Sequence, residues 1–168
     1  MTAAAHAAQV AALVSTLADA LRSRGAMIAT AESCTGGLIA GACTDLAGSS
    51  DWFDRGFVSY SNAAKTELLG VDTALIAAHG AVSEPVARAM AAGALARSSA
   101  ALTVAVTGVA GPSGGSAAKP VGTVWLAWAW REQDGSLRTE TRRELYPGGR
   151  DEVRRWTVRC ALERLLIE

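Results

Sequence analysis

Residues 31–37, with the sequence Ala-Glu-Ser-Cys-Thr-Gly-Gly, constrain the fold more than any other segment. The Met-Ile-Ala-Thr run at 27–30 favours a strand, and the apolar run after the glycines favours a helix. The first backbone N–H groups of a helix lack internal partners and carry the positive end of its dipole, so they can hold an anion or a developing oxyanion. The segment therefore predicts a strand-to-helix junction with the hydroxyl of Ser33 beside an electropositive spot.

The same junction also has an ordinary structural interpretation. Serine and threonine before a helix are common N-caps, and paired glycines are common turn residues. The spacing alone does not decide between the two interpretations. In the functional one, Ser33 is a candidate nucleophile, and the N–H groups near Thr35, Gly36 and Gly37 are candidate donors to an oxyanion.

Helical and strand-like patterns alternate along the chain, which predicts an α/β fold. The run at 101–106 is apolar except for Thr103, as expected for a central strand covered on both faces. Gln133-Asp134-Gly135 predicts a hairpin turn, so we expect one domain over 1–168, a three-layer α/β/α sandwich with a mostly parallel, mixed sheet. The expected helices cover 4–24, 35–45, 62–69, 83–98 and 150–166, and the expected strands cover 26–31, 56–60, 102–107, 122–130 and 136–145.

Charge balance and the scarcity of cysteine and histidine exclude several classes of function. Sixteen Lys and Arg balance sixteen Asp and Glu, so the chain lacks the basic footprint of a general nucleic-acid binder, and we expect no direct nucleic-acid partner. Three cysteines without paired spacing and two histidines form no recognisable zinc set. This composition indicates a reducing, cytoplasmic location and a protein without a bound metal.

The alanine-rich N-terminus resembles a signal peptide in composition only. It lacks a basic start, and apolar residues recur at helical spacing, namely Val10, Leu13, Val14, Leu17 and Leu21. An amphipathic first helix explains this pattern better. We find no apolar run near the roughly 18 residues that a membrane span needs, so we expect a soluble protein.

The glycine-rich residues 108–122 predict a loop that leaves a central strand, where α/β sheets usually bind ligands. The loop has neither the Gly-Lys-Ser/Thr ending of a Walker A motif nor a dinucleotide-binding fingerprint, so ATP and NAD hydride chemistry lose support. We expect no organic cofactor. Thr107 and Gly108 are candidate ligand contacts, although a threonine at a strand end is often only a β-former.

A serine nucleophile needs a base, and Lys65 is the best-placed candidate. Ser61 has the position of an N-cap, which puts Lys65 in the first turn of a helix, where the dipole and partial burial would lower its pKa. The alternative is a solvated lysine that pairs with Glu67. His79 precedes Gly80 at an expected helix end and is more typical of a structural histidine.

Four other residues are candidates near this site. Tyr60 closes a strand before Lys65, and its hydroxyl could relay a proton or hold an amide, unless its ring lies in the core. Asn62 adjoins the same turn. Cys34 is a rival nucleophile, because a helix N-terminus lowers a thiol pKa, but we expect a small buried residue. Arg150 opens the last helix and could clamp a phosphate, or could pair with Asp151 at the surface.

Five motifs that occur in order resemble those of the nicotinamide-nucleotide amidase family, also known as the C-terminal domain of the competence/damage-inducible protein CinA. The resemblance extends over essentially the whole chain. The motifs are residues 31–37, Ala47-Gly48-Ser49-Ser50, Gly56-Phe57-Val58-Ser59-Tyr60-Ser61-Asn62-Ala63-Ala64-Lys65, Gly80-Ala81-Val82-Ser83-Glu84-Pro85 and Gly108-Val109-Ala110-Gly111-Pro112.

The resemblance implies an amidohydrolase that converts nicotinamide mononucleotide to nicotinic acid mononucleotide and ammonia in pyridine nucleotide salvage. It implies that Ser33 is the nucleophile, that Lys65 is the base and that Tyr60 also belongs to the catalytic residues. The expected substrate-binding residues are Thr35, Gly36, Gly37, Asn62, Thr107, Gly108 and Arg150. A homo-oligomer is also expected. The family's association with competence and DNA-damage genes leaves open a non-catalytic nucleotide-binding or regulatory module.

Overall fold

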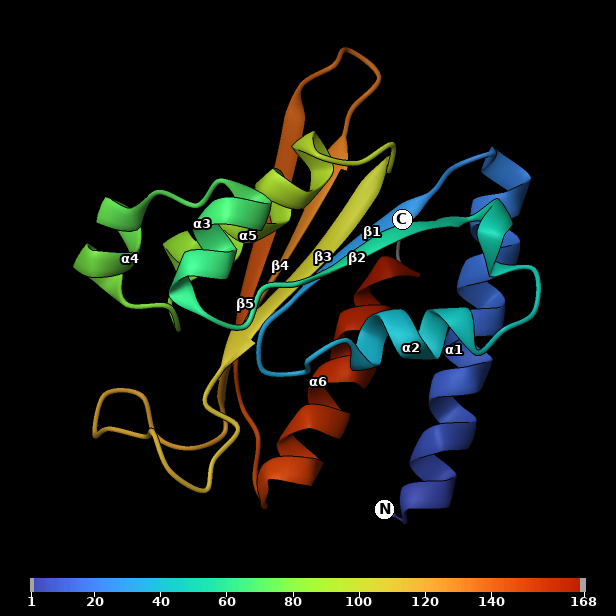
Figure 1. Cartoon of the computed structure of the whole chain (residues 1–168). Helices are drawn as coiled ribbons and strands as arrows, with labels where there is room; N and C mark the ends of the chain where they lie inside the picture. Colours follow the sequence, from blue (N-terminus) through green and yellow to red (C-terminus); the bar gives the residue numbers. More distant parts are fainter. Residues whose placement is uncertain (1, 167–168) are drawn as a thin grey trace.

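The computed structural model describes residues 2–166 as a five-stranded open sheet between two layers of helices (Figure 1). The strands are β1 (Ile28–Glu32), β2 (Phe53–Val58), β3 (Leu102–Gly108), β4 (Thr123–Arg131) and β5 (Leu137–Leu145). The helices are α1 (Ala3–Arg24), α2 (Leu38–Thr44), α3 (Asn62–Leu69), α4 (Thr73–His79), α5 (Glu84–Ala96) and α6 (Arg150–Leu165), with a short 3₁₀ helix η1 (Ser49–Asp51).

The strand order β2-β1-β3-β4-β5 gives a mixed sheet, as expected. Strand β1 pairs in parallel with β2 and β3, whereas β4 pairs antiparallel with β3 and β5. Because β1, β2 and β3 run in the same direction, their carboxyl ends meet at one edge. The segments that follow them and the start of α6 lie at this edge (Figure 1).

The two faces of the sheet carry different side chains. Helices α1, α2 and α6 cover large sheet residues, namely Ile28, Val104, Val106, Leu126 and Trp128. Helices α3, α4 and α5 cover the other face, where the sheet offers Ala29, Ala31, Ala105, Ala127 and Ala129. Both sets are buried, and they alternate along each strand because successive strand residues point to opposite faces. The predicted three-layer α/β/α sandwich is thus confirmed.

The main differences between the expected and the observed elements concern α2, β2 and α4. Helix α2 begins at Leu38 rather than at 35, because Gly36 and Gly37 adopt positive φ angles of 60° and 98° and close a turn before it. Strand β2 begins at Phe53 rather than at 56. Helix α4 ends at His79, where a helix end is expected, but no range is expected for it from the sequence, because its seven residues are too few for a clear periodic pattern. Asp72 caps this helix by accepting from the Ala74 N–H.

Helix α1 corrects the expectation about membrane spans. Within residues 2–166 it is a helix long and apolar enough, by length and composition only, to cross a membrane. A helix of a protein core passes the same test. In the fold, one side of α1 is buried in the core, through His6, Val10, Val14, Leu17, Ala18 and Leu21. This packing matches the amphipathic helix that the sequence predicted.

Candidate active site

Ser33 follows directly after β1 at the carboxyl edge of the sheet. Its backbone N–H donates to the carbonyl of Val106 in β3 at 3.0 Å, and the carbonyl of Glu32 accepts from the Ser59 N–H at 2.9 Å. The segment is therefore held from both neighbouring strands. Ser33 is 8% exposed, so its hydroxyl is shielded from bulk water but remains at the surface of the site.

Lys65 reaches Ser33 from α3, which spans the predicted residues 62–69. The Ser61 hydroxyl accepts from the Ala64 N–H at 3.0 Å, which confirms the predicted N-cap. Lys65 is 1% exposed, and its Nζ lies 3.0 Å from the Oγ of Ser33. The alternative of a solvated lysine paired with Glu67 is therefore wrong.

The surroundings of the Lys65 amine favour its neutral form. Nζ also donates to the carbonyls of Ser59 at 3.0 Å and Tyr60 at 3.2 Å, and no carboxylate pairs with it among residues 2–166. Burial lowers the pKa of Lys65 from its ordinary value of 10.5. A neutral amine has two hydrogens, which the two carbonyls can accept, and a lone pair, which can take the Ser33 proton.

The donors for an oxyanion are not all where the sequence predicted them. The Gly36 N–H donates to the Ser33 carbonyl at 3.1 Å, and the Gly37 N–H donates to the Glu32 carboxylate at 3.1 Å. Both groups are thus already bonded, which corrects the expectation for Gly36 and Gly37. The N–H groups of Cys34 and Thr35 have no acceptor in the described part of the chain and are the remaining candidates.

The buried carboxylate of Glu32 occupies the start of α2. It accepts from the Thr35 hydroxyl at 2.6 Å and from the N–H groups of Gly37, Ile39 and Ala40 at 3.1, 3.0 and 2.8 Å. The anion that the sequence expected at this helix end is therefore supplied by the chain itself. Glu32 has no role among the sequence-based expectations, because its partners lie in the next turn and helix.

Tyr60 and Arg150 contact each other at the rim of the site. Tyr60 is 59% exposed, so the alternative that its ring lies in the core is wrong. The guanidinium of Arg150 donates to the Tyr60 hydroxyl at 3.2 Å and to the Gly111 carbonyl at 3.0 Å. The pairing of Arg150 with Asp151 is also wrong, because Arg155 takes that carboxylate.

A second arginine of α6, Arg154, contacts the turn that contains the nucleophile. Arg154 donates from Nη2 to the Thr35 carbonyl at 3.0 Å, and its Nε is buried without a hydrogen-bond partner among the described residues. Sequence reasoning missed Arg154. Its spacing of four residues from Arg150, on the same helical face, was the signal that could have found it.

Thr107 and Gly108 end β3 at the same edge of the sheet. The Thr107 hydroxyl donates to the Ala81 carbonyl at 2.9 Å, which leaves its oxygen lone pairs free to accept from a ligand. A Cβ at Gly108 would come within 2.8 Å of the Thr123 carbonyl, so close strand pairing accounts for this glycine.

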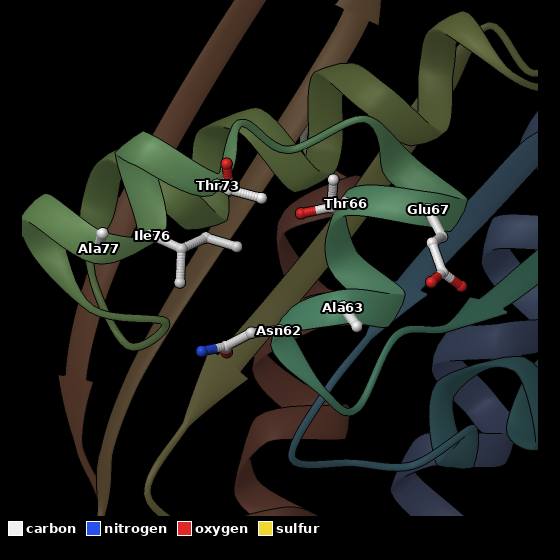
Figure 2. A pocket seen from close by; sticks show the side chains of 7 residues that line it. All are labelled: Asn62, Ala63, Thr66, Glu67, Thr73, Ile76 and Ala77. Atoms are coloured by element: carbon white, nitrogen blue, oxygen red, sulfur yellow. The ribbon is translucent and has the colours of Figure 1, made fainter.

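Asn62 is exposed at the start of α3 and faces a different hollow. A cavity of about 430 Å³ lies between α3 and α4, and Asn62, Thr66 and Ile76 are among the residues that line it (Figure 2). Neither Ser33 nor Lys65 lines this cavity. No hydrogen bond joins Asn62 to Ser33 or to the Lys65 amine within the described residues.

Cys34 fits the expected small buried residue and not the rival nucleophile. It is 5% exposed, and burial raises the pKa of its thiol to about 12. No group of three or more histidine, cysteine, aspartate or glutamate side chains suited to a metal ion occurs within residues 2–166.

The fold and the site define an α/β enzyme whose polar groups converge on a serine hydroxyl at the carboxyl edge of the sheet. The model of the CinA C-terminal domain family matches residues 10–168. The chain belongs to this family.

Curated relatives share the enzyme class. The chain is 54% identical over 147 residues to the nicotinamide-nucleotide amidohydrolase PncC of Escherichia coli strain K12, covering 88% of this chain and 87% of the relative. It is 54% identical over 154 residues to the protein of the same name from Pseudomonas putida, covering 92% and 93%. The chain is accordingly an amidohydrolase.

Solved structures of the family share the fold. The competence/damage inducible protein CihA from Agrobacterium tumefaciens is 49% identical, with a TM-score of 0.88 over 95% of this chain and 96% of that chain. The competence damage-inducible protein A from Klebsiella pneumoniae is 40% identical, with a TM-score of 0.88 and the same shares covered.

Proposed function

We propose that this protein hydrolyses the carboxamide of nicotinamide mononucleotide to give nicotinic acid mononucleotide and ammonia. The observation that carries the proposal is the Lys65 amine, buried without a carboxylate partner among the described residues and 3.0 Å from the Ser33 hydroxyl. The names of the curated relatives supply the substrate class. The two residues supply a nucleophile and a base of the kind that amide hydrolysis needs.

In the first half of the proposed reaction, Ser33 Oγ attacks the carboxamide carbon while Lys65 Nζ takes the hydroxyl proton. The carbonyl oxygen becomes an oxyanion, and the N–H groups of Cys34 and Thr35 are the donors proposed to hold it. The C–N bond then breaks as Lys65 returns the proton to the departing nitrogen, which leaves as ammonia. An acyl ester on Ser33 remains.

In the second half, water attacks the acyl ester. Lys65 takes a proton from the water and returns it to Ser33 Oγ, so the acid is released and the enzyme is restored. Every proton in this cycle passes through one amine, which requires that amine to be neutral at the start of each half. The lowered pKa of Lys65 supports this requirement.

The phosphate of the substrate is assigned to Arg150, whose guanidinium lies at the rim of the site beside Tyr60. Arg150 forms no ion pair with a carboxylate among the described residues, so its charge is available to an anionic ligand. Tyr60 is proposed to orient this arginine, and Thr107 to accept a hydrogen bond from the carboxamide nitrogen.

The test is the release of ammonia from nicotinamide mononucleotide by the purified protein. Wild-type protein is expected to release ammonia and form nicotinic acid mononucleotide in equal amounts, and Ser33→Ala is expected to release none above background. Binding of the mononucleotide without turnover would contradict the proposal and favour the non-catalytic nucleotide-binding module. We also expect a homo-oligomer, which light scattering tests.

A further inference from the structure

The side chain of Glu32 is a buried carboxylate that takes no part in the proposed reaction. It is 1% exposed, and no Lys or Arg ion pair to it is present within residues 2–166. Burying an unpaired carboxylate is costly unless hydrogen-bond donors compensate the charge. The Thr35 hydroxyl and three N–H groups at the start of α2 provide this compensation.

Helix α2 in turn depends on Glu32 for its beginning. Its N-cap residue is Gly37, which has no side chain to accept from the first N–H groups. A helix whose first N–H groups are not bonded is destabilised. The carboxylate of Glu32 accepts from three of them and so performs the capping from the preceding strand.

The same carboxylate fixes the turn that contains the nucleophile. Glu32 and Ser33 are adjacent, and their side chains point to opposite faces of the sheet, toward α2 and toward Lys65. The turn is held by Val106 at one end, through the Ser33 N–H, and by the bonds of Thr35 and Gly37 to Glu32 at the other. Between these anchors only the N–H groups of Cys34 and Thr35 remain without an acceptor among the described residues.

We propose that Glu32 is a positioning residue for the amide hydrolysis. Its carboxylate holds the 33–37 turn so that the Ser33 hydroxyl stays at the Lys65 amine, and so that the Cys34 and Thr35 N–H groups stay directed at the substrate carbonyl. Glu32 itself does not touch the substrate. This inference rests on the proposed function, because it assigns the turn a role in the same reaction.

The first test compares Glu32→Gln with wild-type protein. The amide has one acceptor oxygen instead of two and places an NH₂ group among N–H donors, so the turn should lose its fixed geometry. Since small misplacement of reacting groups costs about 10²-fold in rate, kcat is expected to fall roughly 10- to 100-fold with KM changed less than about threefold. An unchanged kcat in folded Glu32→Gln would overturn the proposal.

Two sets of variants separate positioning from general stability. Asp72→Asn removes a capping carboxylate from α4, far from the nucleophile in the chain, and is expected to keep wild-type kcat. Thr35→Val removes the hydroxyl that donates to Glu32 and should lower kcat, whereas Thr35→Ser retains that hydroxyl and should lower kcat less. Equal kcat values of the two Thr35 variants would contradict the proposal. This comparison remains valid even if Glu32→Gln does not fold.

A second readout does not require the natural substrate. The rate at which phenylmethylsulfonyl fluoride labels Ser33, followed by mass spectrometry, reports the geometry of the nucleophile and base alone. Glu32→Gln is expected to be labelled at least about tenfold more slowly than wild type. If the reagent labels Ser33 but the protein does not hydrolyse nicotinamide mononucleotide, the proposed substrate is wrong. The ratio of the labelling rates of wild type and Glu32→Gln then still tests the role of Glu32. Equal labelling rates of wild type and Glu32→Gln would overturn the positioning role.

Discussion

The Nζ of Lys65 lies 3.0 Å from the Oγ of Ser33, although the two residues are 32 positions apart in the sequence. The pairing of β1 with β2 brings them together, since Glu32 stands opposite Val58 and the chain continues from β2 through Ser59 to α3. The contact therefore depends on the register of two parallel strands. A shift of that register by one residue would turn Ser33 to the other face.

Replacement of the nucleophile should abolish activity without unfolding the protein. Ser33→Ala removes one hydroxyl, and we expect ammonia release to fall by about 10³-fold or more while the thermal midpoint stays within a few degrees. Cys34→Ala is the matched control and should retain activity, because the thiol is buried and its pKa is raised to about 12. An active Ser33→Ala with an inactive Cys34→Ala would reverse the assignment.

Replacement of the base should distinguish proton transfer from a fixed positive charge. We expect Lys65→Arg to be nearly as inactive as Lys65→Ala, because a guanidinium stays protonated and cannot accept the serine proton. The measurement is kcat for ammonia release from both variants, with circular dichroism to verify folding. Substantial activity in Lys65→Arg would show that the charge matters rather than the proton transfer.

Stability should depend on pH through Lys65, and the sign follows from its pKa. Burial lowers the pKa of the folded state below 10.5, so between these two values the unfolded chain binds the additional proton. The contribution of Lys65 is then fully present above about 10.5 and is lost as pH falls through the folded-state value. We expect the free energy of unfolding of wild type, minus that of Lys65→Met, to rise from pH 7 to 10 in urea titrations. A flat or falling difference would contradict the assignment.

Loss of the rim arginine should affect only phosphate-bearing substrates. Arg150→Ala is expected to lower kcat/KM for nicotinamide mononucleotide roughly ten- to a hundredfold, the scale of one charge-assisted contact of about 1.5 to 3 kcal/mol. Nicotinamide riboside lacks the phosphate, so wild type should process it poorly and the variant no worse. Equal losses on both substrates would assign Arg150 to the fold or to the chemistry.

Chelation should leave the reaction intact. We expect ammonia release to continue after exhaustive EDTA treatment and dialysis, since the proposed cycle moves its protons through Lys65 alone. Recovery of a lost activity by added Zn²⁺ or another divalent ion would require a different mechanism.

The sequence predicted the parts of the site that depend on local patterns. The N-cap at Ser61, the helix over 62–69 and the start of α6 at Arg150 follow from capping and periodicity, and the structure has them. The layers of the sandwich also followed, because the alternation of helical and strand-like segments fixes the class of fold.

Contacts between distant segments could not be predicted from local patterns. Nothing in the residues near Lys65 shows that its amine meets Ser33 or the carbonyls of Ser59 and Tyr60, and only the family resemblance paired the first two. The role of Glu32 was hidden because its partners lie in the next helix, up to eight positions away. The hydrogen bond from Arg154 to the Thr35 carbonyl joins residues that are 119 positions apart in the sequence.

The alanine-lined face of the sheet bears on how this protein could be redesigned. Five small side chains beneath α3, α4 and α5 leave no room for larger ones, and overpacking such a layer costs about 1 to 3 kcal/mol per added group. The segment between α4 and α5, on the same side of the sheet, carries the Ala81 carbonyl that accepts from the Thr107 hydroxyl. An engineer who wants a new substrate range would therefore mutate the exposed residues 112–118 of the loop and leave the alanines unchanged, because variants with enlarged alanines would misfold.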